Sequence, residues 1–339
     1  MKVDNRHPVA EYWETEGGKI RCELCPNRCL IAPGKLGRCL GRRNVDGKLV
    51  AENYGEVVSY AVDPIEKKPL YHFYPGAEIF SVATYGCNLL CPFCQNWEIS
   101  QRRVPSRYIA PAELVELVKS YGLKLISYTY TEPLIWFEYV RDAGKLMHQA
   151  GIKNVLVTNG MVNLEPLNEI LPVVDAMNID LKSIKPEFYR NYVHGFLDAV
   201  LATIRRARAH CHIELTTLLI PGKNDSDEEL EELTDFVAGL GENTVLHFSR
   251  YFPRYKVNEP MTPELTLMRA AEIAKRKLNY VYLGNVYLGP EFRDTFCPQC
   301  QTVLVERSGY QGRVVNVQAG RCASCGRKVD LVLDEDDRR

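Results

Sequence analysis

Three cysteines in the middle of the chain have the spacing of iron–sulfur cluster ligands. Cys87, Cys91 and Cys94 lie in the segment GCNLLCPFC, in the pattern CxxxCxxC. Three thiolates on one short loop suit three corners of a [4Fe-4S] cluster, which normally takes four cysteines. Since no fourth cysteine stands nearby in the sequence, one iron would stay open to another ligand, which is typical of a catalytic site. The alternatives are a zinc site completed by a distant ligand and a ferredoxin-like cluster with a remote fourth cysteine.

A second set of cysteines lies near the C-terminus. Two CxxC knuckles separated by 21 residues have the spacing of a zinc ribbon, and tetrahedral thiolate sites of this kind are usually structural zinc. The knuckles consist of Cys297, Cys300, Cys322 and Cys325. A short module without its own core gains stability from such a metal, and this role is favoured over binding of nucleic acid or protein.

A third set lies near the N-terminus among Gly, Pro and Arg residues. It has the spacing CxxCx3Cx9C and consists of Cys22, Cys25, Cys29 and Cys39. Four thiolates suit either structural zinc or an auxiliary iron–sulfur cluster, and the spacing favours neither. The twelfth cysteine, Cys211, stands alone and is expected to be a small buried residue.

The composition indicates a cytoplasmic globular protein. With 42 basic and 43 acidic residues, the net charge of -1 provides no basic field for nucleic acid. No stretch approaches the roughly 18 apolar residues of a membrane span, and the N-terminus lacks the apolar core of a signal peptide. In a reducing compartment twelve cysteines in spaced groups favour metal or cluster ligation over disulfides.

The elements that must position the cysteines alternate between strand and helix. Such alternation is typical of a parallel sheet. Expected strands lie near 78–85, 124–131, 154–158, 173–181, 212–220 and 244–251, and expected helices near 134–149, 226–240 and 263–277, with another that begins at Pro111. Six such units are two short of a closed eightfold barrel. We therefore predict an α/β fold, a partial (β/α)6 TIM-like barrel with small cysteine-rich metal modules at both ends, flanked by a seventh strand at 280–286.

Four regions follow from the cysteine spacing and this alternation. They are an N-terminal four-cysteine metal module at 1–60, the partial barrel at 61–290, a zinc ribbon at 291–330 and a disordered charged tail at 331–339.

One face of the expected sheet is polar. Alternation along the strands places Asn178, Asp180 and Lys182 on one side, and Glu214 and His247 follow the same rule on later strands. Small closed barrels are packed with apolar side chains, so a polar inner face predicts a lumen that holds water and ligand. The alternative, a face open to solvent, fits poorly with a sheet covered by helices.

The cysteine loop and three motifs at strand ends resemble the radical S-adenosylmethionine (SAM) superfamily. In that superfamily CxxxCxxC, with an aromatic residue such as Phe93 before the last cysteine, follows the first strand of a partial barrel. The sequence YTEP at 130–133 is similar to the GGEP motif of pyruvate formate-lyase activating enzymes, with both glycines replaced. TNG at 158–160 and DLK at 180–182 match motifs on the third and fourth strands.

The resemblance implies which residues hold SAM. It places Glu132, or the backbone beside it, at the amino group of SAM. It places Asp180 and Lys182 at the carboxylate and ribose, and His247 near the ribose.

The TNG turn adds Thr158 and Asn159 to these cofactor contacts. The activating enzymes carry an aspartate before TNG that helps to hold a monovalent cation, whereas this chain has Val157.

A narrower resemblance covers residues 20–290. HFYPG at 72–76 and GCNLLCPFCQNWEIS at 86–100 are similar to the radical SAM protein of the AmmeMemoRadiSam system. That resemblance implies Memo-like and AMMECR-like proteins as partners.

The function that follows is reductive cleavage of SAM at the [4Fe-4S] cluster to a 5'-deoxyadenosyl radical, which abstracts hydrogen from an unidentified substrate. The electron would come from a donor such as ferredoxin or flavodoxin. The alternatives are activation of a glycyl radical protein and, in another class, a zinc-ribbon adaptor or RNA-associated module. The near-zero net charge counts against RNA.

Overall fold

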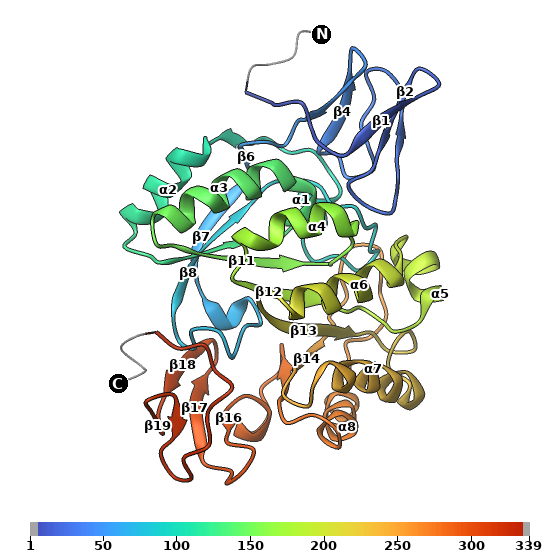
Figure 1. The fold of residues 1–339 in the computed structure, drawn as a ribbon. Coiled ribbons are helices and arrows are strands. Elements are labelled where there is room, and N and C mark those ends of the chain that lie inside the picture. Colours follow the sequence, from blue (N-terminus) through green and yellow to red (C-terminus); the bar gives the residue numbers. More distant parts are fainter. Residues whose placement is uncertain (1–5, 335–339) are drawn as a thin grey trace.

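The computed structural model describes residues 6–334, and its centre is an eight-stranded sheet (Figure 1). Neighbouring strands from β8 to β15 are parallel and follow one another in sequence order, while β7 pairs antiparallel with β8 at one edge. From that edge the strands are β7 (Ser59–Pro64), β8 (Glu78–Ala83), β10 (Leu125–Tyr128), β11 (Lys153–Thr158), β12 (Ala176–Asp180), β13 (His212–Leu219), β14 (Val245–Arg250) and β15 (Val281–Gly284).

Helices connect the parallel strands and form an outer layer (Figure 1). They are α1 (Trp97–Ser100), α2 (Pro111–Ser120), α3 (Phe137–Gln149), α4 (Leu164–Ile170), α5 (Pro186–Phe188), α6 (Leu197–Arg208), α7 (Asp227–Leu240) and α8 (Glu264–Lys275). In the described part of the chain β7 and β15 do not pair, so the barrel is open. The prediction of an α/β fold with a parallel, partial barrel is confirmed, including the seventh parallel strand.

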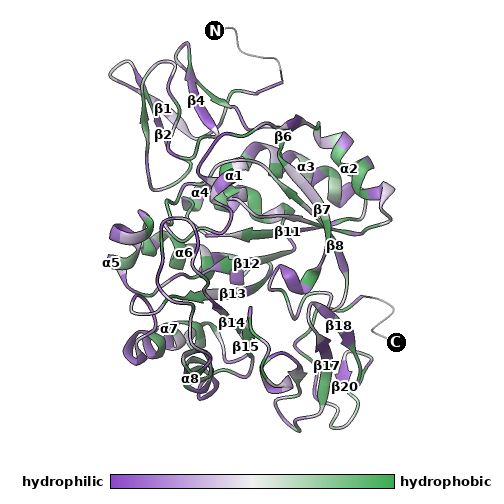
Figure 2. Ribbon diagram, turned by 180° about the vertical axis from the view of Figure 1, so that it is seen from behind, coloured by the Kyte–Doolittle hydropathy of each residue, from purple (hydrophilic) through white to green (hydrophobic). Residues whose placement is uncertain are grey.

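Local sequence explains the helix boundaries. In α2, Pro111 occupies the first turn and the Glu113 carboxylate accepts from the Ala110 amide at 2.8 Å. In α7, Ser226 caps the start by accepting from the Glu229 amide at 3.3 Å. The strands beneath are apolar, and Figure 2 shows β8 and β11 as hydrophobic segments.

The lower part of the lumen, at the amino ends of the strands, is filled by the chain itself. The segment after β7, which contains the short turn Ile65–Lys67, packs Ile65, Leu70 and Phe73 against the inner residues Val155 and Ala176. The expectation of a polar lumen open to ligand is therefore wrong for this part.

Two polar inner residues at this level are held by other parts of the chain. Glu214 accepts from the backbone amides of Tyr71 and His72 at 2.9 and 2.7 Å, and the Asn178 amide donates to the Pro69 carbonyl at 2.8 Å. The chain itself therefore occupies the amino ends of the strands.

The N-terminal region consists of short antiparallel strands beside α3 and α4 (Figure 1). They are β1 (Trp13–Glu16), β2 (Lys19–Cys22), β3 (Leu30–Ile31), β4 (Arg42–Val45) and β5 (Lys48–Ala51), followed by β6 (Glu56–Val57), which pairs with β9 (Arg107–Tyr108). The expected boundary at residue 60 falls inside β7, a strand of the central sheet.

The C-terminal region packs beneath the sheet near β7 and β8 (Figure 1). It contains β16 (Thr295–Phe296), β17 (Val303–Ser308), β18 (Gln311–Val314), β19 (Val317–Gln318) and β20 (Arg321–Cys322). From it the fully buried Arg307 donates to the Tyr71 carbonyl at 2.6 Å and stacks on the Tyr71 ring at 4.2 Å.

The end of this region corrects the predicted tail. Val332 donates to the His72 carbonyl at 2.7 Å and accepts from the Tyr74 amide at 2.8 Å, and Leu333 is buried. These contacts fix residues 331–334 to the barrel, so a disordered tail cannot begin at 331, and its residues 335–339 lie outside the described part. Across residues 6–334 no helix is long and apolar enough to cross a membrane.

Candidate active site

The cysteine loop begins a few residues after β8, at the carboxyl end of the sheet. Cys91 is buried, while Cys87 and Cys94 are partly buried. The Leu89 amide donates to Cys87 Sγ at 3.4 Å, and Cys94 Sγ lies 3.2 Å from Ser100 Oγ. Burial raises the pKa of Cys87 overall, against the opposing effect of the Leu89 amide.

Gly86 allows this loop to turn against the N-terminal region. Its φ of +95° is rarely adopted by other residues, and a Cβ there would lie 2.0 Å from the Cys39 carbonyl oxygen. Only glycine fits at this position.

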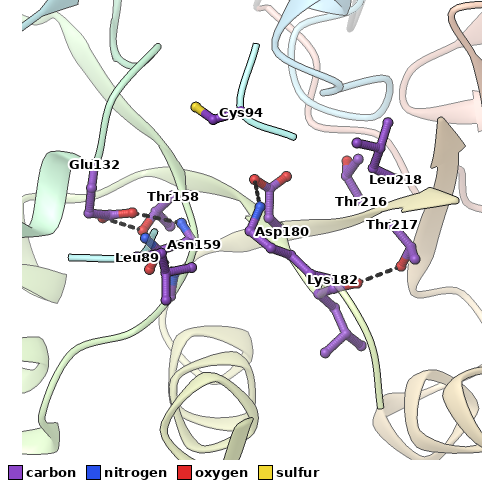
Figure 3. A network of polar contacts seen from close by, with 12 residues as sticks. Leu89, Cys94, Glu132, Thr158, Asn159, Asp180, Lys182, Thr216, Thr217 and Leu218 are labelled. Carbon is purple, nitrogen blue, oxygen red and sulfur yellow. Dashed lines mark hydrogen bonds and ion pairs between the residues drawn. The ribbon is translucent and has the colours of Figure 1, made fainter. Parts of the chain in front are cut away.

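Glu132 connects the YTEP segment to the TNG turn (Figure 3). Its carboxylate accepts from Thr158 Oγ1 at 2.6 Å, from the Asn159 amide at 2.8 Å and from the Leu134 amide at 2.8 Å. Burial raises the pKa of Glu132 to about 7, against the opposing effect of these donors. Both carboxylate oxygens thus hold the turn in place.

Asn159 extends the connection to the cluster loop. Its side-chain amide donates to Asn88 Oδ1 at 2.9 Å and lies 3.5 Å from Cys87 Sγ. Asn88 in turn donates to the Met161 carbonyl at 2.7 Å. The structure therefore brings together Glu132, the TNG turn and the first cysteine, which lie on three different strand ends.

The contacts of Tyr130 explain how the YTEP segment keeps its backbone conformation although Tyr130 replaces a glycine of the GGEP motif. It has a φ of +66°, in the left-handed region that favours glycine. Its hydroxyl donates to Asp63 of β7, and Lys68 Nζ lies 4.5 Å from its ring centroid. Contacts from the ring therefore hold a backbone conformation that glycine adopts freely.

Asp180 and Lys182 lie on the neighbouring strand end (Figure 3). Lys182 Nζ is 2.8 Å from Asp180 Oδ2, and the Asp180 side chain is 37% exposed against 15% for Lys182. Burial lowers the pKa of Lys182, but Asp180 and Cys91 outweigh it and raise the pKa overall. A charged pair of both signs therefore stands beside the cysteine loop, with the carboxylate accessible.

His247 belongs to a different network. Its Nε2 lies 2.6 Å from Glu214 Oε2, and both residues are buried. Glu214 also accepts from His212 at 3.0 Å. Burial acts to raise the pKa of Glu214, but the hydrogen bonds from the two histidines outweigh it and lower the pKa overall. The structure thus joins His247 to the filled part of the lumen and not to the network of Glu132, and its predicted contact with the ribose stays a prediction.

Two residues of the site region were missed by sequence reasoning. Asp63 accepts from Lys68 Nζ at 2.6 Å as well as from the Tyr130 hydroxyl, and Lys68 is 1% exposed. Burial lowers the pKa of Lys68 to about 8. In the sequence, only their proximity to HFYPG could have drawn attention to Asp63 and Lys68. Their spacing does not indicate a contact with the YTEP segment.

The residues present suit a [4Fe-4S] cluster and SAM. Three thiols lie on one loop without a fourth cysteine in it, and the Thr84 hydroxyl just before the loop is buried and has no partner in the described residues. A partly exposed carboxylate and an ammonium group stand at the neighbouring strand end, and they complement the amino and carboxylate groups of an amino-acid ligand.

The C-terminal cysteines form a compact group. Cys297 and Cys325 have their sulfur atoms 3.6 Å apart, as do Cys300 and Cys322, and all four lie within 4.8 Å of one another. A tetrahedral ion with metal–sulfur bonds of about 2.3 Å requires sulfur atoms about 3.8 Å apart. This group has the geometry to bind a single metal ion.

Comparison with known proteins identifies the family. A family model described as the radical SAM superfamily matches residues 81–237, which contain the cysteine loop and the motifs on β10, β11 and β12. The chain belongs to the radical SAM superfamily and is an enzyme of that class, whose members use a [4Fe-4S] cluster, SAM and a one-electron donor.

The chain is also similar to individual proteins. An uncharacterized protein of Methanocaldococcus jannaschii is 43% identical over 331 residues, which cover 95% of this chain and 98% of that protein. The pyruvate formate-lyase 1-activating enzyme of Escherichia coli K12 is 24% identical over 168 residues, covering 46% of this chain and 67% of that enzyme. The crystal structure of a radical SAM methyltransferase from Sphaerobacter thermophilus, 18% identical, has the same fold with a TM-score of 0.50 and covers 62% of this chain and 67% of that one.

Proposed function

We propose that this enzyme cleaves SAM reductively at a [4Fe-4S] cluster held by Cys87, Cys91 and Cys94. When bound and reduced, the cluster supplies one electron that breaks a carbon–sulfur bond of SAM, giving methionine and a 5'-deoxyadenosyl radical that takes a hydrogen atom from the substrate. The protein's part is to bind, to orient and to exclude water.

The residues around the loop would divide this work. Asp180 and Lys182 would bind the charged and polar groups of SAM, because their side chains lie beside Cys91 and carry both signs. Glu132 would act indirectly, because its carboxylate already accepts hydrogen bonds from Thr158, Asn159 and Leu134. We assign it to positioning of the TNG turn.

The observation that carries the proposal is the connection from the strand ends to the cluster loop. Asn159 lies 3.5 Å from Cys87 Sγ and 2.9 Å from Asn88, and its own amide is held by Glu132. A loop that only bound a structural metal would not need strand-end motifs of three βα units fixed against it. The electron would come from a protein donor such as ferredoxin or flavodoxin.

A glycyl radical protein is the second candidate substrate. It is favoured by the likeness to the Escherichia coli activating enzyme over residues that include the barrel motifs. A glycine-centred radical on a partner protein after anaerobic incubation with reduced enzyme and SAM would support it.

Formation of 5'-deoxyadenosine tests the proposal. The anaerobically reconstituted protein, reduced with dithionite and given SAM, should release 5'-deoxyadenosine and methionine in equal amounts. The Cys91→Ala variant should release neither, while Cys211→Ala, a change outside the three sets, should behave like wild type. Equal traces from wild type and Cys91→Ala would overturn the proposal.

A further inference from the structure

The four N-terminal cysteines line one cavity. Besides the cysteines, the cavity is lined by Arg42, Asn88 and Ile135 among others. Cys22, Cys25 and Cys39 are buried and Cys29 is partly exposed. Four thiols around one cavity suit a bound metal ion or an iron–sulfur cluster.

The sulfur spacing separates this set from the C-terminal one. The C-terminal sulfur atoms lie within 4.8 Å of one another and could hold one ion, whereas within residues 6–334 the N-terminal cysteines form no such single-ion group. The same is true of Cys87, Cys91 and Cys94. Around a cubane each thiolate binds a different iron, so the sulfur atoms stand farther apart than around one ion. The N-terminal set therefore resembles the cluster loop of this same chain and not its compact metal group.

The guanidinium group of Arg42 has a buried N–H donor that lacks a hydrogen-bond acceptor. Its side chain is 1% exposed and lines the cavity, and its Nη2 is held by both Glu138 oxygens at 2.9 Å. Its Nε is buried and has no partner in the described residues. An unpaired buried guanidinium N–H is costly, and the sulfides of an anionic cluster would accept from it.

The cavity adjoins the cluster loop. Asn27 donates to the Asn88 carbonyl at 2.8 Å, and Asn88 itself lines the cavity next to Cys87 in the sequence. On the other side, the Cys39 carbonyl packs against Gly86 so closely that no Cβ fits. The two sets of thiols thus lie on segments that contact each other.

We propose that Cys22, Cys25, Cys29 and Cys39 bind a second [4Fe-4S] cluster, with all four irons ligated by cysteine, next to the cluster that binds SAM. The C-terminal cysteines bind a single ion. The second cluster would not take SAM, because it has no open iron.

Metal counts distinguish this arrangement from two zinc sites. The protein, purified anaerobically after growth with iron, should contain about eight iron and eight sulfide per chain, since each cubane holds about four of each. Zinc should be about one per chain. About four iron with about two zinc per chain would overturn the proposal.

A variant of the proposed active site isolates the second cluster. The triple change Cys87→Ala, Cys91→Ala and Cys94→Ala should keep about four iron per chain, and its reduced form should give a paramagnetic signal that SAM does not alter. Loss of all iron from this variant, with retained zinc and a wild-type circular dichroism spectrum, would refute a second cluster. Since the variant has no proposed SAM site, its iron content is independent of whether wild type cleaves SAM.

The complementary variant tests the ligands. Cys25→Ala with Cys39→Ala should lose about half of the iron and keep a signal that changes with SAM. Unchanged iron in this variant would contradict the assignment of these cysteines.

Discussion

At the scale of single residues, the candidate site contains side chains that hold backbone as well as side chains that we propose to bind SAM. Cys87, Cys91 and Cys94 were predicted as cluster ligands because their spacing is itself the signal, and this stays a prediction. The positioning role of Glu132 could not be predicted from the sequence. Its carboxylate accepts three hydrogen bonds from residues of the same chain, and a motif does not reveal whether a carboxylate faces a ligand or the backbone.

Replacement of Glu132 by Gln tests this positioning role. A glutamine nitrogen would face a donor of the TNG turn and break at least one charge-assisted bond, so the free energy of unfolding should fall by about 2 kcal/mol. The yield of 5'-deoxyadenosine should fall as well. Urea unfolding of wild type and variant measures the first effect, and Glu116→Gln, at an exposed ion pair on α2, should change stability by less than about 0.5 kcal/mol. A Glu132→Gln protein as stable as wild type would contradict the role.

Replacement of Asp180 by Asn separates binding from cluster assembly. The variant removes the partly exposed carboxylate but leaves all cysteines, so the iron content should match wild type. The affinity for SAM should fall by about tenfold or more, which corresponds to about 1.4 kcal/mol. Equilibrium binding of SAM gives the affinity, and Asp198→Asn on exposed α6 is the matched control. Unchanged affinity would remove Asp180 from the site.

At the scale of elements, the parallel strands followed directly from the alternation of short apolar runs and helical patterns. The α4 and α6 helices were missed, α4 because Pro166 and its seven-residue length leave little periodicity. The filling of the lower lumen was also missed. Tyr71, His72 and Phe73, which fill this part of the lumen, belong to the HFYPG region. The pattern of that region matches neither strand nor helix, so only the fold shows that these side chains occupy the lumen.

The buried His72 gives this element a pH dependence. Its Nδ1 donates to the Asp330 carbonyl at 2.8 Å and its Nε2 accepts from Tyr282 at 2.7 Å, and burial lowers its pKa to about 4. Between pH 6.5 and 4 the unfolded chain therefore binds a proton that the folded chain does not. Over this range His72 should cost the folded protein about 3 kcal/mol of stability as the pH falls.

The measurement compares thermal unfolding of wild type and His72→Asn at several pH values. The difference in thermal stability between wild type and His72→Asn should be largest at pH 7 and should shrink as the pH falls toward 4. Leu265→Ala, at an exposed position of α8 that does not titrate, should show a constant difference. A wild-type advantage that does not depend on pH would contradict a neutral buried His72.

At the scale of the whole molecule, the C-terminal metal group supports the barrel from the side opposite the proposed active site. Arg307 is held by the Tyr71 carbonyl and ring, and Val332 bridges the backbone at His72 and Tyr74. The spacing of the two CxxC knuckles predicted a metal site at the C-terminal cysteines. No sequence pattern indicated that this region packs against the residues that fill the lower lumen.

Removal of the C-terminal metal should therefore weaken the barrel without removing its clusters directly. Cys297→Ser with Cys322→Ser should lose about one zinc per chain and retain the iron. Its unfolding midpoint should fall, because metal binding contributes to folding. Zinc and iron analysis with circular dichroism checks both outcomes, and an unchanged midpoint after loss of zinc would contradict the supporting role.

The central claim is that the three-cysteine loop leaves one iron free to bind SAM. Electron paramagnetic resonance of the reduced protein, recorded with and without SAM, tests it most directly. We expect SAM to change the g values of the signal that disappears in the Cys87→Ala, Cys91→Ala, Cys94→Ala variant. A signal that saturating SAM leaves unchanged in wild type would contradict the claim.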